Sequence, residues 1–251
     1  MHWTDTAIIL STRKFGETSA VAHVLTHDHG VHGGIVRGAS SKTNRGVIQP
    51  GNVVNATWSA RLSEQLGSLK CELQSAHAAH LMNDPARLAA LTSVCTLIGQ
   101  SLPERHPYPH LYRITMEFLT MLQTSDHWPE ALVRLELEIL AETGFGLELT
   151  ECAATGTKED LIYVSPKSGR AVSREPGEAS KDKLLPLPVF LRPHTRKNRV
   201  EISEILDGLQ MTGYFLQHWL LEPHNRKMPA SRDRLKQLLH KTDSAQAANA
   251  T

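Results

Sequence analysis

Three histidines and a carboxylate fall within six residues near the N-terminus, and side chains of these types can hold a metal ion. They are His27, Asp28, His29 and His32. Imidazole nitrogens and carboxylate oxygens are common zinc ligands, so a metal-dependent hydrolase is one chemistry that the spacing admits. The run also has turn chemistry, and alternate residues of a strand point to opposite faces. We therefore expect His29 and His32 to be split across a sheet, and we favour an exposed histidine-rich turn over a metal site.

Two other patterns approach catalytic motifs without completing them. Residues 38–43 resemble the end of a phosphate-binding loop, but that motif requires glycine directly before its lysine and again six residues before it. For Lys42 those positions hold Ser41 and Val36. The sequence also has no Gly-x-Ser-x-Gly turn for a serine nucleophile. The sequence shows no assembled site of nucleophile, base and oxyanion donors. It therefore favours a binding protein over an enzyme.

The clearest functional signal is a basic window. Residues 29–63 contain no acidic residue, and their arginines and lysine lie among strand-like segments and tight turns. Fixed cations on a rigid sheet displace the counterions that condense on a sugar-phosphate backbone, so this window suits nucleic-acid binding. The alternative is a solvated loop that only keeps the protein in solution. A second cluster without acids, residues 192–199, admits the same two interpretations.

Several strand-like segments in residues 6–75 position these cations. Short apolar runs alternate there with glycine-containing and polar turns. About five short strands in such a span, with turn signals between them, are typical of a small closed barrel. Trp58 is then either a barrel core residue or a platform on which a nucleic-acid base stacks.

From about Ala76 the apolar spacing becomes helical. We expect helices beginning at Pro85, around residues 111–122 and from Pro129 to Gly144. The last has apolar positions nearly all round and should be central and buried. Residues 150–183 are polar and glycine-containing and predict an excursion or flexible loop with one hairpin-like segment. Residues 202–219 and 234–240 predict further helices, and the residues after 242 predict disorder.

The composition indicates a cytoplasmic protein. The chain has 251 residues and a formal charge of +1, so it can bury a real core and form two or three modules. Three widely spaced cysteines imply no disulfide framework and a reducing compartment. Neither an apolar run near 18 residues nor an N-terminal signal sequence is visible, so we expect a soluble protein.

Four short motifs occur in order along the chain. A strand followed by Gly16 and Glu17 fills residues 7–18, and a Thr-x-x-x-Gly turn and an Arg-Gly-Ala loop follow at 26–30 and 37–41. A helix that ends in Gly-Phe fills residues 133–145, and a Ser-Arg pair stands at 231–232. Their order and spacing resemble those of RecO, a family of bacterial recombination-mediator and DNA-repair proteins.

The resemblance implies an α+β multidomain chain. Residues 1–76 would form an oligonucleotide/oligosaccharide-binding (OB-fold) β-barrel. Residues 77–242 would form a mostly α-helical C-terminal domain, with the 150–183 excursion as a degenerate zinc-finger-like region. Residues 243–251 would be a disordered tail.

The resemblance also implies a function without enzymatic activity. Such a protein binds single- and double-stranded DNA, anneals complementary strands, and helps to load the RecA recombinase onto DNA coated by single-strand-binding protein. The implied partners are DNA, RecR and the acidic, apolar C-terminal tail of single-strand-binding protein, with RecA as an indirect partner and no membrane. The implied location is the bacterial cytoplasm, in association with the nucleoid.

One departure from the family concerns zinc. Many members carry a four-cysteine zinc site after the central helix. Here Cys152 fits the first position, but Thr155 stands at the second, and residues 168–173 lack the later pair. One thiolate cannot hold a tetrahedral zinc, so we predict that no structural zinc or other cofactor is bound.

We expect the barrel cations to contact DNA phosphates, because neutralising two strands lowers their repulsion and allows annealing without ATP. An RNA-binding OB-fold protein without a recombination role is the alternative, and a metallo-hydrolase is a distant third. The candidate DNA-binding residues are Arg13, Lys14, Arg37, Lys42, Arg45 and Arg61. An apolar groove flanked by cations would suit the acidic tail. The candidate partner-binding residues are Arg134, Arg196, Lys197 and Arg199.

Overall fold

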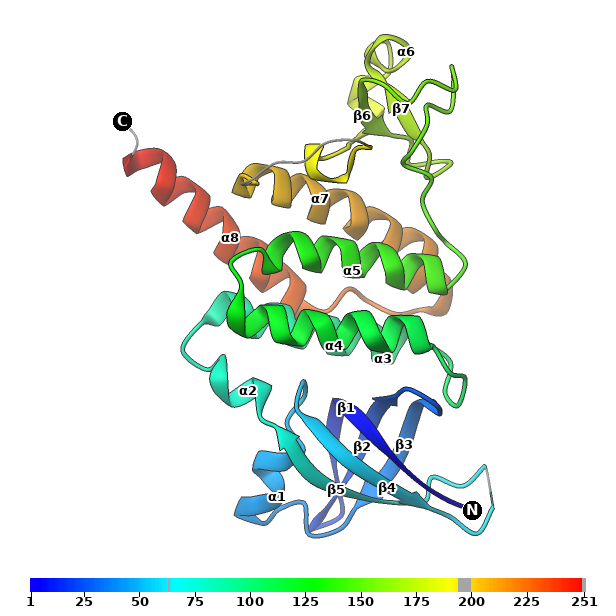
Figure 1. Cartoon of the computed structure of the whole chain (residues 1–251), viewed down its shortest axis with the longest axis vertical. Helices are drawn as coiled ribbons and strands as arrows, with labels where there is room; N and C mark the ends of the chain where they lie inside the picture. Colours follow the sequence, from blue (N-terminus) through cyan, green and yellow to red (C-terminus); the bar gives the residue numbers. More distant parts are fainter. Residues whose placement is uncertain (63, 194–199, 250–251) are drawn as a thin grey trace. The chain divides into compact units, whose positions relative to one another are not determined.

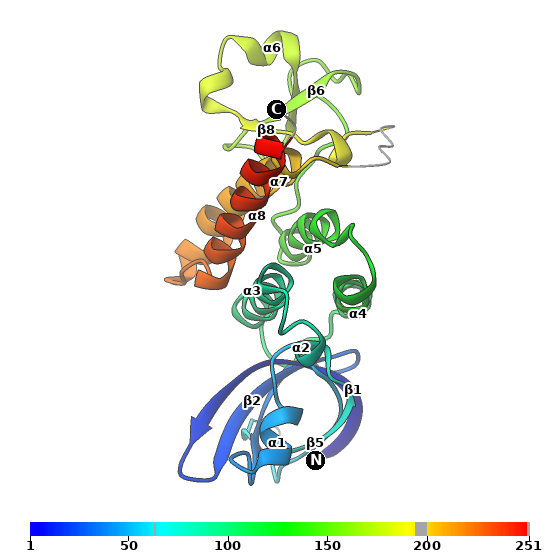
Figure 2. The same ribbon diagram turned by 90° about the vertical axis from the view of Figure 1, so that its left-hand side faces the viewer.

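The computed structural model describes residues 1–62, 64–193 and 200–249 (Figures 1 and 2). Its contacts group into two compact units. One comprises Met1–Asp126 with Pro229–Arg232, and the other comprises His127–Met228 with Asp233–Thr251. The helices that follow the barrel up to residue 126 therefore group with it. The division of the chain at residue 76 stays a prediction.

The first unit contains a closed five-stranded barrel (Figure 2). Its strands follow the order β1-β2-β3-β5-β4, and β4 pairs back to β1. This closure confirms the predicted small barrel, because an open sheet would leave two unpaired edges. The strands are β1 (His2–Phe15), β2 (Ser19–Thr26), β3 (Gly30–Val36), β4 (Val53–Ser59) and β5 (Ser68–Ser75).

Alternating side chains of these strands fill the barrel. Ala7 and Ile9 of β1 belong to the core, together with Val24 of β2 and Leu69 of β5. Trp58 of β4 lies among them with only 2% of its surface exposed. Its Nε1 donates to the carbonyls of Gly33 (3.2 Å) and Leu66 (3.0 Å). Trp58 is therefore a core residue, and the base-stacking interpretation of this side chain is wrong.

The turn between β2 and β3 requires its glycine. Gly30 has a φ of +63°, and a Cβ there would clash with the backbone oxygen of His106. The hydroxyl of Thr26 accepts from the backbone N–H of His29 at 2.9 Å and closes the turn. The Thr-x-x-x-Gly pattern therefore fixes the local backbone of this hairpin.

A short helix, α1 (Lys42–Val47), connects β3 to β4 where the sequence suggested only turns. The Ser41 hydroxyl accepts from the Asn44 backbone N–H at 3.2 Å and caps the helix N-terminus. The Asn44 side chain donates back to the Gly38 carbonyl at 3.0 Å. Serine is a preferred N-cap residue, but a six-residue helix has too little apolar periodicity to predict.

Three helices complete the first unit. They are α2 (His77–His80), α3 (Pro85–Ser101) and α4 (Pro109–Thr124). Asp84 caps α3 by accepting from the backbone N–H groups of Ala86 and Arg87, as expected for Asp-Pro at a helix start. The Arg87 guanidinium donates to the carbonyls of Leu122 and Ser125, which ties α3 to the end of α4.

The second unit is built around α5 (Trp128–Glu142), which packs on α7 (Ile202–Phe215). Leu132, Val133, Ile139 and Leu140 of α5 are fully buried, which confirms the prediction of a central, buried helix. Gly208 of α7 allows close approach, because a Cβ there would lie 3.0 Å from the Val133 side chain. A π-helical segment, Leu216–Leu221, continues α7, and Glu222–His224 forms a short 3-10 turn.

The 150–183 excursion contains more structure than a loop. Strands β6 (Leu161–Val164), β7 (Ala171–Ser173) and β8 (Leu185–Pro186) form a small sheet in the order β7-β6-β8. The predicted hairpin-like segment at 161–164 is β6. Helix α6 (Arg174–Glu178) and 3-10 turns at Lys181–Lys183 and Val189–Leu191 complete the region.

The C-terminal segment differs from the predicted disordered tail. Helix α8 runs from Ala230 to Asn249 and includes the expected helix at 234–240. Alanine and glutamine in residues 245–248 are strong helix formers, so the helix can continue without an apolar face. Among the described residues, no helix is long and apolar enough to span a membrane.

Candidate nucleic-acid interface

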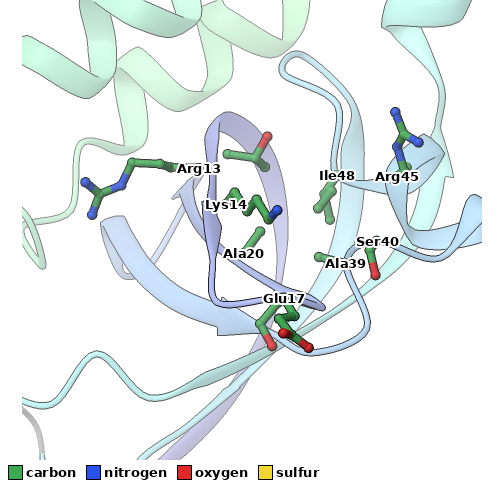
Figure 3. Close-up of a pocket in the computed structure, with 10 residues that line it drawn as sticks. Arg13, Lys14, Glu17, Ala20, Ala39, Ser40, Arg45 and Ile48 are labelled. Carbon is green, nitrogen blue, oxygen red and sulfur yellow. The ribbon is translucent and has the colours of Figure 1, made fainter.

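A pocket of about 430 Å³ opens at one end of the barrel (Figure 3). Its walls come from the end of β1, the β1–β2 hairpin, the start of β2 and residues 39–48. The backbone N–H of Ser40 donates to the Thr18 carbonyl at 3.3 Å and so joins the hairpin to the segment before α1. The lining residues are Thr12, Arg13, Lys14, Glu17, Ser19, Ala20, Ala39, Ser40, Arg45 and Ile48.

Strand alternation separates the two adjacent cations of β1. Lys14 pairs with Ala20 of β2, and Ala20 belongs to the barrel core. Lys14 therefore points to the barrel side of the sheet, and Figure 3 shows its amine directed into the pocket. Arg13 pairs with Val21, and its guanidinium extends from the other side of the strand (Figure 3).

Arg45 contributes a third cation from helix α1 (Figure 3). It lies in the last turn of α1, and its backbone N–H donates to the Ser41 carbonyl at 3.0 Å. The serine cap therefore sets the position of this arginine relative to the hairpin. The pocket thus receives positive charge from two segments that are about 30 residues apart in the sequence.

The structure brings together only half of the predicted DNA-binding residues. Arg13, Lys14 and Arg45 line the pocket. Arg37 follows β3, Lys42 begins α1 and Arg61 lies in the turn after β4. These three are exposed but do not line the pocket.

All six cations are available for an anionic ligand. Each is exposed, and within the described part of the chain none of them forms a salt bridge. Unpaired surface cations can neutralise phosphates without first breaking an internal ion pair. These six side chains are therefore better suited to binding a polyanion than to stabilising the fold through ion pairs.

Glu17 is a pocket residue that the sequence reasoning did not single out as part of the site. Its side chain lies at the hairpin turn, on the rim of the pocket (Figure 3). A carboxylate here repels a phosphate near Lys14 and lowers the net positive charge of the pocket. Its place three residues after Lys14 was visible in the sequence, but only the hairpin turn brings it to the rim.

The histidine cluster does not form a metal site in the described residues. His29 stacks on Trp3 at 4.4 Å between ring centroids, and His32 meets the same ring edge-on at 5.1 Å. The prediction that the sheet separates the two is therefore wrong, because His29 precedes β3 and both rings contact Trp3. His27 lies instead against Asp28 and Tyr112. No group of three or more potential metal ligands occurs in the parts of the chain that are described.

His32 is buried in this aromatic cluster. It is 6% exposed, lies edge-on to Trp58 at 4.6 Å, and neither ring nitrogen has a hydrogen-bond partner among the described residues. Burial, with a smaller contribution from the charge of Arg105, lowers the pKa of His32 to about 4. The imidazole is therefore neutral at physiological pH and acts as a packing group.

Cys152 occupies the place where a zinc ligand was considered. Its thiol is 1% exposed and accepts from the backbone N–H and hydroxyl of Ser173 at 3.3 and 3.2 Å. Burial raises the pKa of this thiol, but hydrogen bonds from Ser173 and Thr155 outweigh burial and lower it to about 6. Serine and threonine hydroxyls beside one thiolate are not a zinc ligand set, so these residues do not fit the four-cysteine zinc site considered from the resemblance.

The other two cysteines are free thiols in apolar surroundings. Burial raises the pKa of both Cys71 and Cys95 to about 12. Neither is a thiolate near neutral pH, so neither suits metal binding or nucleophilic chemistry.

The predicted partner-binding residues are only partly visible. Arg134 on α5 donates from Nη2 to the Phe190 carbonyl at 2.6 Å, and its guanidinium lies 5.7 Å from the centre of the Phe190 ring. Arg134 therefore holds the 3-10 turn Val189–Leu191 against α5, in addition to any partner that it binds. Arg196, Lys197 and Arg199 lie outside the described residues.

Comparisons with known proteins cover nearly the whole chain. The model described as Recombination protein O N terminal matches residues 1–76, and the model described as Recombination protein O C terminal matches residues 82–228. The "DNA repair protein RecO" of Rhodospirillum centenum is 48% identical over 236 residues, which is 93% of each chain. The protein of that name from Bartonella quintana is 45% identical over 241 residues, covering 96% of this chain and 98% of its own. That from Rhodospirillum rubrum is 42% identical over 250 residues, covering 98% and 99%.

Proposed function

The chain belongs to the RecO family of DNA repair and recombination proteins, and on that premise we propose that it is a recombination mediator. It binds single- and double-stranded DNA, anneals complementary strands, and helps to load RecA onto DNA coated by single-strand-binding protein. The family membership rests on matches to both family models and on 42–48% identity to relatives along most of their length.

The observation that carries the DNA-binding part of this proposal is the pocket at the end of the barrel. Lys14 and Arg45 reach it from different segments, and Arg13 extends from the other side of β1. None of the three is engaged in a salt bridge within the described residues. Each can therefore contact a phosphate and displace a counterion that is condensed on the DNA. The release of these ions favours binding.

Annealing follows from the same charges. Two strands repel each other through their phosphates, and a protein that neutralises both lowers the barrier to pairing. This action needs no bond to be made or broken and no ATP. We accordingly propose a non-enzymatic protein that acts by binding.

The partners belong to the proposal as well. RecR and the acidic, apolar tail of single-strand-binding protein are the direct protein partners, and RecA is reached indirectly. An acidic tail requires an apolar groove flanked by cations. Arg134 is the candidate on α5, and the 192–199 cluster supplies the others. The site of action is the bacterial cytoplasm, at the nucleoid.

The test is fluorescence anisotropy of a labelled single strand across a salt series. The wild-type protein should bind tightly at low salt, with affinity falling steeply as salt rises. Replacing Lys14 and Arg45 together by alanine removes two phosphate contacts. The slope of log affinity against log salt should then become less steep by about 1.4, at about 0.7 per contact on a single strand.

The matched control is Lys70→Ala on β5. Lys70 is exposed on the same barrel but pairs with Glu72 at 2.7 Å and does not line the pocket. Its replacement should leave the slope within about 0.3 of the wild-type value. Equal effects of the pocket and control variants would contradict this site, and salt-independent or absent DNA binding by the wild type would contradict the function.

A second assay separates this function from that of an RNA-binding barrel protein. Complementary DNA strands that carry a donor and an acceptor dye should pair faster when the protein is added. A peptide of the single-strand-binding-protein tail should bind the protein without displacing DNA. Tight RNA binding without DNA annealing or peptide binding would favour the RNA-binding alternative.

A further inference from the structure

Phe15 is an exposed aromatic side chain at the end of β1. Half of its surface is accessible, whereas Ile8, Ile9 and Leu10 of the same strand are at most 2% exposed. Phe15 pairs with Ser19 across the β1–β2 hairpin, and its ring has no aromatic partner among the described residues. Its apolar surface is therefore left open to solvent at the tip of a hairpin.

The position of Phe15 is set by the same alternation that separates Arg13 from Lys14. The register from Ser11 to Phe15 is regular, so Phe15 lies on the same face of β1 as Arg13. Phe15 itself does not line the pocket, although its cross-strand partner Ser19 and the nearby Glu17 do. The ring therefore lies on the same side of β1 as Arg13, and Lys14 lies on the other side.

The hairpin itself does not need an aromatic residue at this place. The turn begins at Gly16, whose φ is +66°, and a Cβ at Gly16 would meet nothing within 4 Å. The backbone pairing of residue 15 with Ser19 requires no particular side chain. The backbone of the hairpin therefore does not explain why an aromatic side chain stands at this position.

We propose that Phe15 is a stacking platform for an unpaired nucleobase, while the neighbouring cations hold the flanking phosphates. This inference rests on the proposed function, because it adds one contact, on the Arg13 side of β1, to the proposed DNA-binding surface. An aromatic ring next to cations that contact phosphates is an arrangement that binds single strands without regard to sequence, since every base has a π face. The expected contribution of one stacked base is about fivefold to a hundredfold in affinity.

Stacking on Phe15 distinguishes single strands from duplexes. Bases in a duplex are already stacked and paired, and cannot reach a ring on the protein surface. The cations contact both forms, but the ring contributes only to the unpaired form. Pairing of two bound strands would then remove a base from Phe15 and favour release of the duplex product.

The experiment compares Phe15→Leu with the wild-type full-length protein on three labelled DNAs of equal length. The DNAs are a single strand of thymidines, the corresponding duplex, and a backbone of abasic sites that keeps the phosphates. Leucine retains apolar bulk but lacks a π face. Affinity for the thymidine strand should fall at least fivefold with an unchanged salt slope, because stacking releases no ions.

The duplex and the abasic strand should bind the variant within about twofold of wild type. Phe15→Trp should retain or increase affinity for the thymidine strand, since indole also offers a stacking face. The control is Met82→Ala, which removes an apolar side chain that is 71% exposed outside the pocket. It should change none of the three affinities.

Two results would overturn the inference while leaving the DNA-binding proposal intact. One is unchanged affinity of Phe15→Leu for the thymidine strand, with a steep salt dependence for wild type. The other is an equal loss on all three DNAs, which would show that residue 15 acts through the fold. Absent binding by the wild-type protein itself would contradict the proposed function and this inference together.

Discussion

Ser173 donates two hydrogen bonds to the sulfur of Cys152, one from its hydroxyl at 3.2 Å and one from its backbone N–H at 3.3 Å. These bonds join β7 to the turn at residues 152–157, where the Cys152 N–H also donates to the Thr157 carbonyl at 2.7 Å. Hydrogen bonds onto a single sulfur thus link segments that a four-cysteine zinc site would otherwise clamp.

The protein is expected to hold no structural zinc. Only one thiol lies in the excursion, and its nearest side-chain neighbours there are hydroxyls. Elemental analysis of tag-free protein should find far less than one zinc per chain, and a chelator should leave the melting temperature unchanged. One zinc per chain, together with a lower melting temperature after chelation, would contradict this prediction.

The Cys152 thiolate should make stability rise with pH. Its pKa is about 6 in the folded protein, below the ordinary value of 9.0, so folding favours the ionised form above pH 6. The added stability is fully present above pH 9 and is lost as pH falls towards 6. Denaturant unfolding at pH 6 and pH 8 should show that the stability difference between wild type and Cys152→Ser grows by on the order of 2 kcal/mol. A difference that is constant with pH would contradict a lowered pKa.

His32 should make the protein sensitive to acid. Its pKa is about 4 in the folded protein and near 6.5 when unfolded, so the neutral form stabilises the fold above pH 6.5. That stability is lost as pH falls from 6.5 to 4, by on the order of 2–3 kcal/mol. Phe in place of His32 keeps an aromatic ring against Trp3 and Trp58 but cannot be protonated. Denaturant unfolding at pH 7 and pH 4.5 should show a smaller acid loss for His32→Phe than for wild type, and equal losses would contradict the prediction.

Removal of the Glu17 charge should strengthen DNA binding. Glu17→Gln takes away a carboxylate that lies on the rim of the pocket, so affinity for a single strand at low salt should rise about two- to fivefold. The gain should disappear near 1 M salt, where the screening length is about 3 Å. Asp28→Asn makes the same change in net charge at the other end of β2 and should have a smaller effect. Equal gains from both variants would indicate a general charge effect and not a local one.

Trp58 should matter for stability and not for DNA contact. Trp58→Phe removes the donor to the buried carbonyl of Gly33 and the partly buried carbonyl of Leu66, at an expected cost of about 1–3 kcal/mol in unfolding free energy. Where both proteins are fully folded, their affinities for a single strand should agree within about twofold. A large loss of affinity without a loss of stability would restore Trp58 as a stacking residue.

Part of the site could be predicted from residue types alone. The acid-free window and the basic pair Arg13–Lys14 near the end of β1 both contain exposed cations, because lysine and arginine remain in solvent unless they are paired. The capped helix α1 was missed, although Ser41 carries its start signal, because six residues show no helical period. The sequence also gave no reason to separate Lys14, which enters the pocket, from Lys42, which does not.

The sequence by itself determined the barrel, the helical second half and the exposure of the cations. Alternating apolar residues, turn glycines and helical spacing are local patterns, so they can be recognised in the sequence before the fold is known. The tertiary structure decided which cations share a pocket. In β1 the register shifts between Ile9 and Ser11, so the core-facing positions change from odd residues, such as Ile9, to even ones, such as Lys14. This bulge depends on how β1 pairs with β2, and the alternation of residue types along β1 does not reveal it. The closed barrel also buries Trp58, and the fold brings His29 and His32 into contact with the same ring, that of Trp3.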